Sequence, residues 1–234
     1  MKLDEISRDI VVHETPAEAV TDFRRPNVWF CDLDADFPGP SALSSAEMER
    51  AMKFKNLLER RRFITHCAFM RRILANFAGA DPAVLTFRDG LHGKPRVDLP
   101  AGSTGGLLST LDFNLSQSEN ILAMAVVFGG EVGIDIEVRS PDVDYMAIAQ
   151  SHFTYAECAR LRALPALEAI PAFYRLWTRL EAMAKAEGRG LALLPPHIGW
   201  AAVRWKLRSF ELQVCGRDVI GALAWNAPGE RSPE

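Results

Sequence analysis

The stretch that decides the fold is "LDFNLSQSENILAMAVVFGGEVGIDIEV", from Leu111 to Val138. Three short runs in it, "LDFNLSQS", "ILAMAVVF" and "VGIDIEV", predict three strands, because each is an apolar or alternating segment bounded by turn residues. The pair Gly129-Gly130 predicts a tight turn that joins the last two of them. This stretch therefore predicts a sheet in the second half of the chain.

Helices and further strands are expected on both sides of these three runs. Before them, "NVWFCDL" predicts a strand, Ser44 or Ser45 is a candidate N-cap, and a longer helix in "ERRRFITHCAFMRRILANFAG" closes at Gly79. After them, helices are expected over about 145–149, 154–164 and 171–187, and a hairpin in "RSFELQVCGRDVIGALAW". The stretch 86–106 is rich in Gly and Pro and predicts a loop with short extended pieces between two halves, 1–106 and 107–234. The chain is therefore expected to be an α+β protein.

Composition limits the classes of protein that the chain can belong to. The net charge is −3 and the pI about 6.0, so the protein as a whole is not a polycation. The start, "MKLDEISRDI", lacks the apolar region of a secretory signal. The longest apolar run, Ile121 to Phe128, is far short of the ~20 residues of a membrane helix. The four cysteines have no metal-binding spacing and are expected to be reduced thiols, which predicts a cytoplasmic protein.

Two carboxylates in "VGIDIE" are expected on one face of the predicted strand, because side chains alternate along a strand. Asp135 and Glu137 point to one side, and Ile134 and Ile136 to the other. At ~3.4 Å per residue the two carboxylates are about 7 Å apart along the strand. With a third oxygen ligand they suit a hard divalent ion such as Mg2+. The strand alone equally fits a solvated polar face on a half-buried sheet.

The segment "FYRLWTRLEAMAKAEGRGL", Phe173 to Leu191, predicts a helix with two distinct faces. Its apolar stripe contains Phe173, Leu176, Trp177, Leu180 and Ala184. At about 100° per residue, a separate face carries Tyr174, Thr178, Glu181 and Lys185. On a solvated surface, Glu181 and Lys185 would form an ion pair of ~0.3–0.5 kcal/mol. Together with Asp135 and Glu137, they would instead supply three acidic groups and a lysine, which suits phosphoryl chemistry.

A basic segment lies between Arg50 and Arg72, with Glu59 as its only acid. Its basic residues are Arg50, Lys53, Lys55, Arg60, Arg61, Arg62, Arg71 and Arg72. This local excess of positive charge is a candidate polyanion site, and a solvated helix face is the alternative. Further on, "GKP" places Lys94 on a rigid turn, and Ser116, Gln117 and Ser118 in "NLSQS" are all able to hydrogen-bond phosphate oxygens.

These motifs, in this order, resemble the 4′-phosphopantetheinyl transferases of the two-domain, surfactin-synthetase-activating (Sfp) type. The resemblance covers about Arg50 to Leu191 and rests on "GKP", "FNLSQS", "VGIDIE" and the helix from Phe173. It implies two similar α/β halves related by a pseudo-twofold axis, with coenzyme A and Mg2+ in the cleft between them. It also implies transfer of 4′-phosphopantetheine from coenzyme A to a serine of an apo acyl or peptidyl carrier protein, with release of adenosine 3′,5′-bisphosphate.

The resemblance also implies a role for each matching residue. Asp135, Glu137 and Glu181 would hold the metal, and Glu181 would also act as, or position, the base that deprotonates the carrier serine. Lys185 would stabilise or protonate the leaving group. The residues implied to bind the nucleotide and its phosphates are Arg62, Lys94, Ser116, Gln117 and, as a looser match, Arg50. Such a protein is expected to be a monomer with no nucleic-acid or membrane partner.

Two positions depart from the pattern of this family. Gln117 stands where the family usually has histidine, which affects recognition of the 3′-phosphate, and Leu180 stands on the apolar stripe where the family usually has lysine. The alternatives are a Mg2+-dependent phosphohydrolase or nuclease, and a non-catalytic binder of coenzyme A or nucleic acid. The negative net charge argues against nucleic-acid binding. Retention of all three acids and Lys185 argues against a decayed enzyme.

Overall fold

The structure is a computed structural model that describes residues 9–18, 20, 22–37, 39–90, 93–98, 110–188 and 205–226. The elements up to residue 128 are β1 (Val11–His13), β2 (Asn27–Asp32), η1 (Pro40–Ala42), α2 (Ser45–Met52), α3 (Leu57–Ala78), η2 (Pro82–Val84), β3 (Thr86–Asp89), β4 (Pro95–Asp98), β5 (Leu111–Ser118) and β6 (Ile121–Phe128). Those that follow are β7 (Val132–Val138), α4 (Tyr145–His152), α5 (Tyr155–Ala163), α6 (Ala166–Ala186), β8 (Lys206–Val214) and β9 (Arg217–Trp225).

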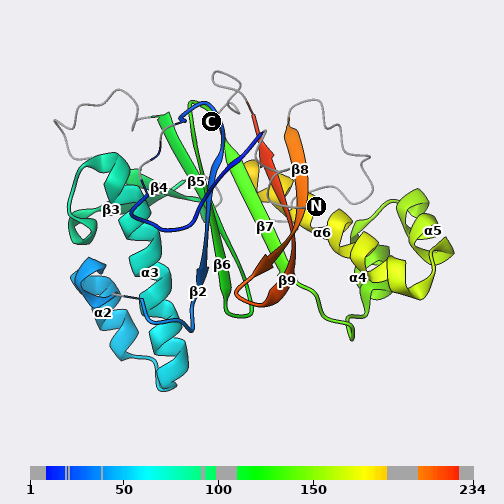
Figure 1. The fold of residues 1–234 in the computed structure, drawn as a ribbon, viewed down its shortest axis with the longest axis horizontal. Coiled ribbons are helices and arrows are strands. Elements are labelled where there is room, and N and C mark those ends of the chain that lie inside the picture. Colours follow the sequence, from blue (N-terminus) through cyan, green and yellow to red (C-terminus); the bar gives the residue numbers. More distant parts are fainter. Residues whose placement is uncertain are drawn as a thin grey trace.

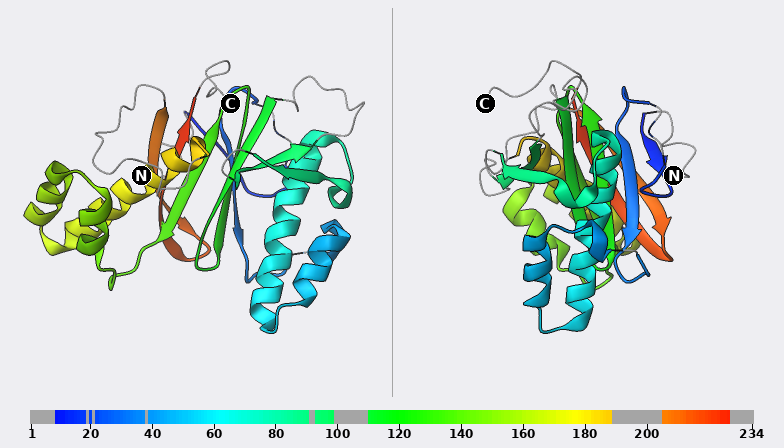
Figure 2. Two further views of the ribbon diagram at one scale, coloured as in Figure 1. Left: turned by 180° about the vertical axis from the view of Figure 1, so that it is seen from behind. Right: turned by 90° about the vertical axis from the view of Figure 1, so that its left-hand side faces the viewer.

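The described strands form two larger sheets and one separate hairpin. The first sheet has the order β1-β2-β6-β5, the second has the order β7-β9-β8, and β3 pairs with β4. Figure 1 shows the sheets in the middle of the molecule, with α2 and α3 on one side and α4, α5 and α6 on the other. The same arrangement is seen from behind and from the side in Figure 2. The expectation of an α+β protein is confirmed.

The two sheets repeat one strand order. In the first, β2 pairs with β6 and β6 with β5; in the second, β7 pairs with β9 and β9 with β8. In both, the strand that comes last in the chain lies between the other two and is antiparallel to both. A helical segment separates the first strand from the second in each case. The two units therefore share a topology.

The predicted turn at Gly129-Gly130 joins β6 to β7, and Gly129 has a φ of 77°. The two strands that it joins belong to different sheets, because β6 pairs with β2 and β5, whereas β7 pairs with β9. The tight hairpin turn lies instead at Glu119-Asn120, between β5 and β6, where Glu119 has a φ of 51°. The residues 129–131 connect the two sheets. A pair of glycines indicates a turn, but does not determine which strands pair on either side of it.

Local signals position the helix that covers the first sheet. Ser44 caps α2 and forms a capping box with Glu47. Asn56 caps α3 at its start, and Gly79 closes it with a φ of 58°, as the sequence predicted. The apolar face of α3 is buried on the sheet, where Phe69 contacts the cluster that includes Met124.

The two sheets meet at their edge strands, β5 and β7, through side chains. Four side-chain oxygens of β5 accept hydrogen bonds from four backbone N–H groups of β7, and we call these contacts the polar ladder. Its pairs are Asp112 with Val132, Asn114 with Ile134, Ser116 with Ile136 and Ser118 with Val138, at 2.7, 3.0, 3.2 and 3.0 Å. Alternate side chains of a strand share a face, and alternate N–H groups share an edge, so one face of β5 covers the open edge of β7.

The second sheet is covered by α6. This helix begins before the predicted start at Pro171 and ends at Ala186, close to the predicted end. Thr178 is fully buried on the face that also carries Glu181 and Lys185, both of which are half-buried. This face therefore packs inside the protein, and the interpretation of Glu181 and Lys185 as a solvated surface pair is wrong.

The predicted division at residues 106 and 107 falls outside the described residues and stays a prediction. The pairing of the strands groups β5 and β6, which follow that division, with β2, which precedes it. The four cysteines are free in the structure. In the part of the chain that the structure describes, no helix has the length and apolar character to cross a membrane.

Candidate active site

β7 carries two acidic side chains to the side of the second sheet that α6 covers. Gly133 makes the close approach of α6 possible, because a Cβ there would lie 2.0 Å from the carbonyl oxygen of Ala182 and 2.3 Å from the nitrogen of Ala186. Asp135 and Glu137 alternate with buried neighbours and share the face of Gly133, as the sequence predicted. Both carboxylates are therefore turned toward α6.

Asp135 is the centre of the site and is 4% exposed. Its Oδ1 accepts hydrogen bonds from Lys185 Nζ at 2.7 Å and from Ser116 Oγ at 3.0 Å. Lys185 Nζ also donates to Ser116 Oγ at 3.1 Å. Asp135 Oδ2 is buried and has no hydrogen-bond partner among the described residues. Asp135 thus binds the lysine with one oxygen and keeps the other available for a ligand.

Glu137 is held from two sides. Ser118 Oγ donates to its Oε2 at 2.7 Å, and the side chain of Trp177 on α6 lies close enough to lower its pKa. The Trp177 ring stacks on Phe173 with 6.2 Å between ring centroids, and His152 meets it edge-on at 5.3 Å. These contacts fix the indole, so the position of Glu137 depends on both β5 and α6.

The three predicted acidic ligands share a poorly solvated, negatively charged environment. Burial raises the pKa of Asp135 to about 6, against the charge and the hydrogen bond of Lys185. Burial also raises the pKa of Glu137, and Asp135 adds to that effect. The pKa of Glu181 is raised by burial, opposed by Lys185, and raised further by Glu137. Additional positive charge beside these groups would therefore favour their ionised forms.

The donor set fits a hard divalent cation. Carboxylate oxygens are the preferred ligands of Mg2+, and the buried, unpartnered Oδ2 of Asp135 is such an oxygen. Glu137 is near enough to Glu181 to raise the pKa of Glu181. Within the described ranges, no three His, Cys, Asp or Glu side chains already converge as a metal cluster. The structure thus brings together Asp135, Ser116 and Lys185 by direct contact, and places Glu137 and Glu181 beside them.

Lys94, which was predicted to bind phosphate, is buried beside Asp112, the first residue of the polar ladder. Its Nζ donates to Asp112 Oδ2 at 2.5 Å and to the carbonyl oxygen of Val132 at 2.8 Å. Asp112 Oδ2 also accepts from the Val132 N–H. The Lys94–Asp112 pair therefore binds both backbone groups of Val132 and helps to join the two sheets.

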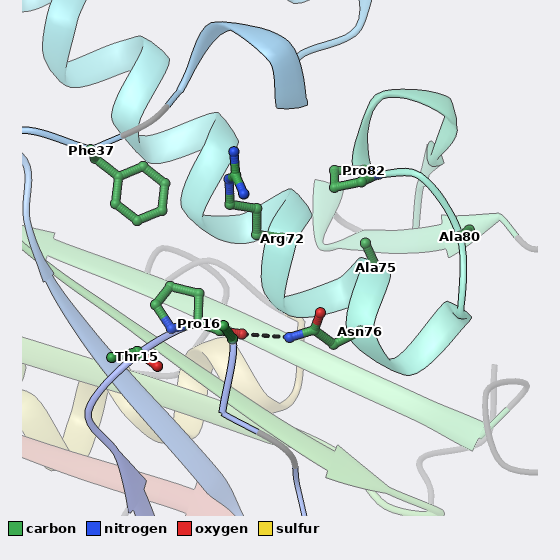
Figure 3. Close-up of a pocket in the computed structure, with 9 residues that line it drawn as sticks. Thr15, Pro16, Phe37, Arg72, Ala75, Asn76, Ala80 and Pro82 are labelled. Atoms are coloured by element: carbon green, nitrogen blue, oxygen red, sulfur yellow. Dashed lines mark hydrogen bonds between the residues drawn. The ribbon is translucent and has the colours of Figure 1, made fainter.

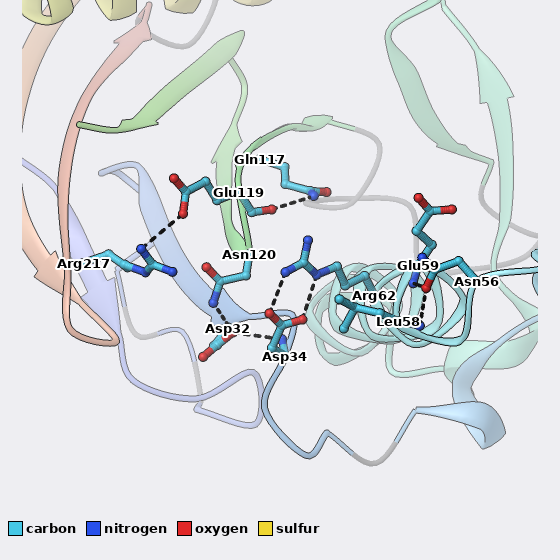
Figure 4. A network of polar contacts seen from close by, with 10 residues as sticks. All are labelled: Asp32, Asp34, Asn56, Leu58, Glu59, Arg62, Gln117, Glu119, Asn120 and Arg217. Atoms are coloured by element: carbon cyan, nitrogen blue, oxygen red, sulfur yellow. Dashed lines mark hydrogen bonds and ion pairs between the residues drawn. The ribbon is translucent and has the colours of Figure 1, made fainter. Parts of the chain in front are cut away.

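Arg62 lies on α3 beside the turn between β5 and β6. It forms a bidentate ion pair with Asp34, in which Nε and Nη2 donate at 2.7 and 2.6 Å (Figure 4). The ion pair lowers the pKa of Asp34 and raises that of Arg62. In this structure the guanidinium is thus held by a carboxylate rather than directed at a phosphate.

Gln117 is exposed, and Figure 4 shows its amide donating to the carbonyl oxygen of Glu119, at 3.1 Å. Its side chain also lies beside His66 on α3 and raises the pKa of His66, whereas burial lowers that pKa by more. An imidazole therefore lies next to the position where the resemblance would place a histidine. Sequence spacing had not indicated this contact.

Much of the positive charge in the basic segment is engaged by protein groups. Arg50 lies over the Phe63 ring at 5.1 Å, and Arg60 donates to the carbonyl oxygen of Phe54. Arg71 is buried and pairs with Glu47 at 2.6 Å. The polyanion interpretation of this segment stays a prediction.

A cavity of about 270 Å³ lies elsewhere, between the N-terminal segment and α3. Figure 3 shows Pro16, Phe37 and Arg72 around it, with Asn76 donating to the carbonyl oxygen of Pro16. None of the predicted site residues lines this cavity. It is therefore separate from the group around Asp135.

Sequence reasoning missed Asp112, which pairs with Lys94, and gave Ser118 and Trp177 other roles. In the structure Ser118 donates to Glu137, and Trp177 lies beside it. A signal for two of them was present, since polar residues alternate along β5 at 112, 114, 116 and 118. Such alternation indicates one polar face of a strand, but the face it meets depends on the arrangement of the two sheets.

Known proteins resemble the chain across the segment that carries this site. A family model described as the 4′-phosphopantetheinyl transferase superfamily matches residues 131–223. A Synechocystis sp. protein named as a candidate 4′-phosphopantetheinyl transferase is 32% identical over 171 residues, 72% of this chain and 67% of that protein. HetI of Nostoc sp., a 4′-phosphopantetheinyl transferase, is 36% identical over 66% of this chain and 63% of its own length. Sfp of Bacillus subtilis, also so named, is 28% identical over 65% of this chain and 63% of its own length. The chain thus spans about two thirds of the length of these relatives.

Proposed function

The chain belongs to the 4′-phosphopantetheinyl transferase superfamily, and on this basis we propose that it moves the 4′-phosphopantetheine group from coenzyme A to a serine of an apo carrier protein, with Mg2+. The enzyme class itself follows from the family and from the named relatives. The metal, the carrier and the roles of individual residues are our proposals. The observation that carries them is the convergence of Asp135, Ser116 and Lys185, with the second oxygen of Asp135 unpartnered.

We propose that the chain is of the two-domain, surfactin-synthetase-activating type, with two α/β halves related by a pseudo-twofold axis. The repeated strand order of β2-β6-β5 and β7-β9-β8 supports this proposal. The similarity to Sfp supports it as well. The polar ladder would then mark the junction of the halves, next to the substrate.

Asp135, Glu137 and Glu181 would hold Mg2+ through their carboxylate oxygens. When bound, the ion would neutralise phosphate charge in the transition state. The positive charge of the ion would also lower the pKa values of these carboxylates, which burial raises. The acids would then be ionised at neutral pH, which suits both ligation and proton acceptance.

In the proposed reaction, the hydroxyl oxygen of the carrier serine bonds to the phosphorus of the phosphopantetheine group. The bond from that phosphorus to the oxygen of adenosine 3′,5′-bisphosphate breaks. Glu181 accepts or directs the serine proton, because its carboxylate lies on the face of α6 that also carries Lys185. Lys185 stabilises or protonates the leaving phosphate, since its ammonium already lies among the acidic groups.

The nucleotide and its phosphates would be bound by Arg62, Lys94, Ser116 and Gln117, with Arg50 as a looser candidate. For Arg62 and Lys94 this proposal requires a change of partner, because both are paired with carboxylates in the structure. We further propose a cytoplasmic monomer whose partners are coenzyme A and an acyl or peptidyl carrier protein.

The test is incubation of the protein with coenzyme A, Mg2+ and a panel of apo acyl and peptidyl carrier proteins, followed by mass spectrometry. The expected result is a phosphopantetheine mass shift on a carrier that EDTA abolishes and Mg2+ restores. Glu181→Gln is expected to lose transfer, whereas Glu168→Gln, an exposed acid on the same helix, retains it. Undiminished transfer in EDTA would refute the metal requirement.

A further inference from the structure

Two serines of the polar ladder each donate a second hydrogen bond, to an acidic side chain of β7. Ser116 Oγ donates to Asp135 at 3.0 Å, and Ser118 Oγ donates to Glu137 at 2.7 Å. Each therefore links the backbone of β7 to one of the acids that β7 carries. Ser116 is also bound by Lys185, so Ser118 has the simpler set of contacts.

The chemistry of a hydroxyl group defines what Ser118 does in this position. A serine has one proton to donate and two lone pairs that accept. The Val138 N–H occupies one lone pair at 3.0 Å and so fixes the oxygen, and the single proton is directed to Glu137 Oε2. No proton is left for a phosphate oxygen. Ser118 is thus committed to Glu137 rather than to the nucleotide.

Asn114 provides an internal comparison on the same strand. Its Oδ1 accepts the Ile134 N–H at 3.0 Å, the same length as the contact between Ser118 and Val138. Its partner Ile134 is a core residue, and no hydrogen bond among the described residues joins Asn114 to an acid. Asn114 and Ser118 therefore contribute equally to the junction of the sheets, and only Ser118 reaches a carboxylate.

We propose that Ser118 is a positioning residue of the metal site, which holds Glu137 between β5 and the indole of Trp177 so that a divalent cation meets a pre-oriented carboxylate. This inference rests on the proposed metal dependence. Groups that hydrogen-bond a ligating carboxylate typically change metal affinity by about 10–100-fold when they are removed. Ser118 lies at the end of β5, where its hydroxyl is the only ladder group within reach of Glu137 among the described contacts.

The test is a Mn2+ titration followed by electron paramagnetic resonance, on the whole protein without coenzyme A or carrier. Mn2+ is the probe because it takes the same oxygen ligands as Mg2+. Wild type, Ser118→Ala and Asn114→Ala are compared, and chemical denaturation of each variant measures stability. Both variants are expected to lose similar stability. Only Ser118→Ala is expected to weaken Mn2+ binding, by about tenfold, and Ser118→Thr, which keeps a hydroxyl, is expected to restore most of it.

The outcomes separate this inference from the proposed function. If the wild type does not bind Mn2+, the proposed metal site fails and the inference fails with it. If the wild type binds Mn2+ and Ser118→Ala binds it equally well, only the inference is overturned. Equal weakening in Ser118→Ala and Asn114→Ala also overturns it, because the ladder would then act through the fold alone. Should the alanine variant not fold, Ser118→Cys, a weak donor of similar shape, is expected to show the same loss of affinity.

Discussion

Replacing Asp135 with asparagine is expected to change the way the stability of the protein depends on pH. The side chain is 4% exposed, and burial raises its pKa from 3.8 to about 6. The native protein therefore keeps a proton on Asp135 at pH values where the unfolded chain has released it. Asparagine has the same shape and does not ionise, so Asp135→Asn removes this titration and preserves the volume of the side chain.

The magnitude follows from the two pKa values. Between them the native state binds more protons than the unfolded state, so the free energy of unfolding falls as the pH rises. From pH 5 to pH 8 the wild-type protein is expected to lose about 1.4 kcal/mol through Asp135, because one pH unit below a native pKa of about 6 corresponds to 1.36 kcal/mol. Above about pH 7 no further loss is expected from this group, since it is ionised in both states.

The new amide adds a separate effect that does not depend on pH. It places an NH2 group where Oδ2 is buried without a partner, at a cost of about 1–3 kcal/mol. The quantity to compare is therefore the change in stability between the two pH values, and not the stability at either one. The charge of Asp135 also raises the pKa of Glu137. Removal of that charge lowers the pKa of Glu137, so the variant also loses less stability through Glu137 as the pH rises.

The assay is urea denaturation of wild type and Asp135→Asn at pH 5 and pH 8, each with and without Mg2+. Without Mg2+, the wild type is expected to lose about 1.4 kcal/mol more than the variant between the two pH values. Millimolar Mg2+ at pH 8 is expected to stabilise the wild type and to leave the variant unchanged. If the two proteins show parallel pH dependence, Asp135 is not the buried, proton-binding acid that the geometry indicates.

Two further predictions concern α6. Lys185→Ala is expected to lower kcat for transfer by about 10²–10³ with a smaller change in the KM for coenzyme A, because a preorganised charged donor acts on the developing charge; wild-type turnover in steady-state kinetics would contradict this role. Gly133→Ala is expected to lower the free energy of unfolding by about 1–3 kcal/mol or more, since the added Cβ would lie 2.0 Å from the carbonyl oxygen of Ala182. It is also expected to reduce transfer, because α6 must move away from β7, and a variant with an unchanged denaturation midpoint and unchanged turnover would disprove the close packing.

Most of the secondary structure could be predicted because its signals are local. The bounds of β5, β6 and β7 coincide with the three runs quoted at the outset, and Gly79 ends α3. Caps, periodicity and glycines act within a few residues of the chain. The same signals left the pairing of β6 and β7 open, because a turn residue specifies where the chain bends and not which strand lies beside it.

For the candidate site as well, local patterns predicted which residues share a face, but not what each face contacts. Alternation along β7 placed Asp135 and Glu137 on one face, and the helical period placed Glu181 and Lys185 on another. The roles implied for Asp135, Glu137, Glu181 and Lys185 came from the resemblance to a family and stay proposals. The sequence left open whether the helix face carrying Glu181 was solvated.

The tertiary structure alone decided which of these faces meet. The ammonium of Lys185 reaches Asp135 because Gly133 lets α6 lie against β7. Ser118 reaches Glu137 because the open edge of one sheet is covered by the polar face of the other. The sequence by itself determined the elements and the faces that carry charge, since a local period depends only on neighbours along the chain. The contacts between those faces depend on burial summed over both sheets, which no local segment contains.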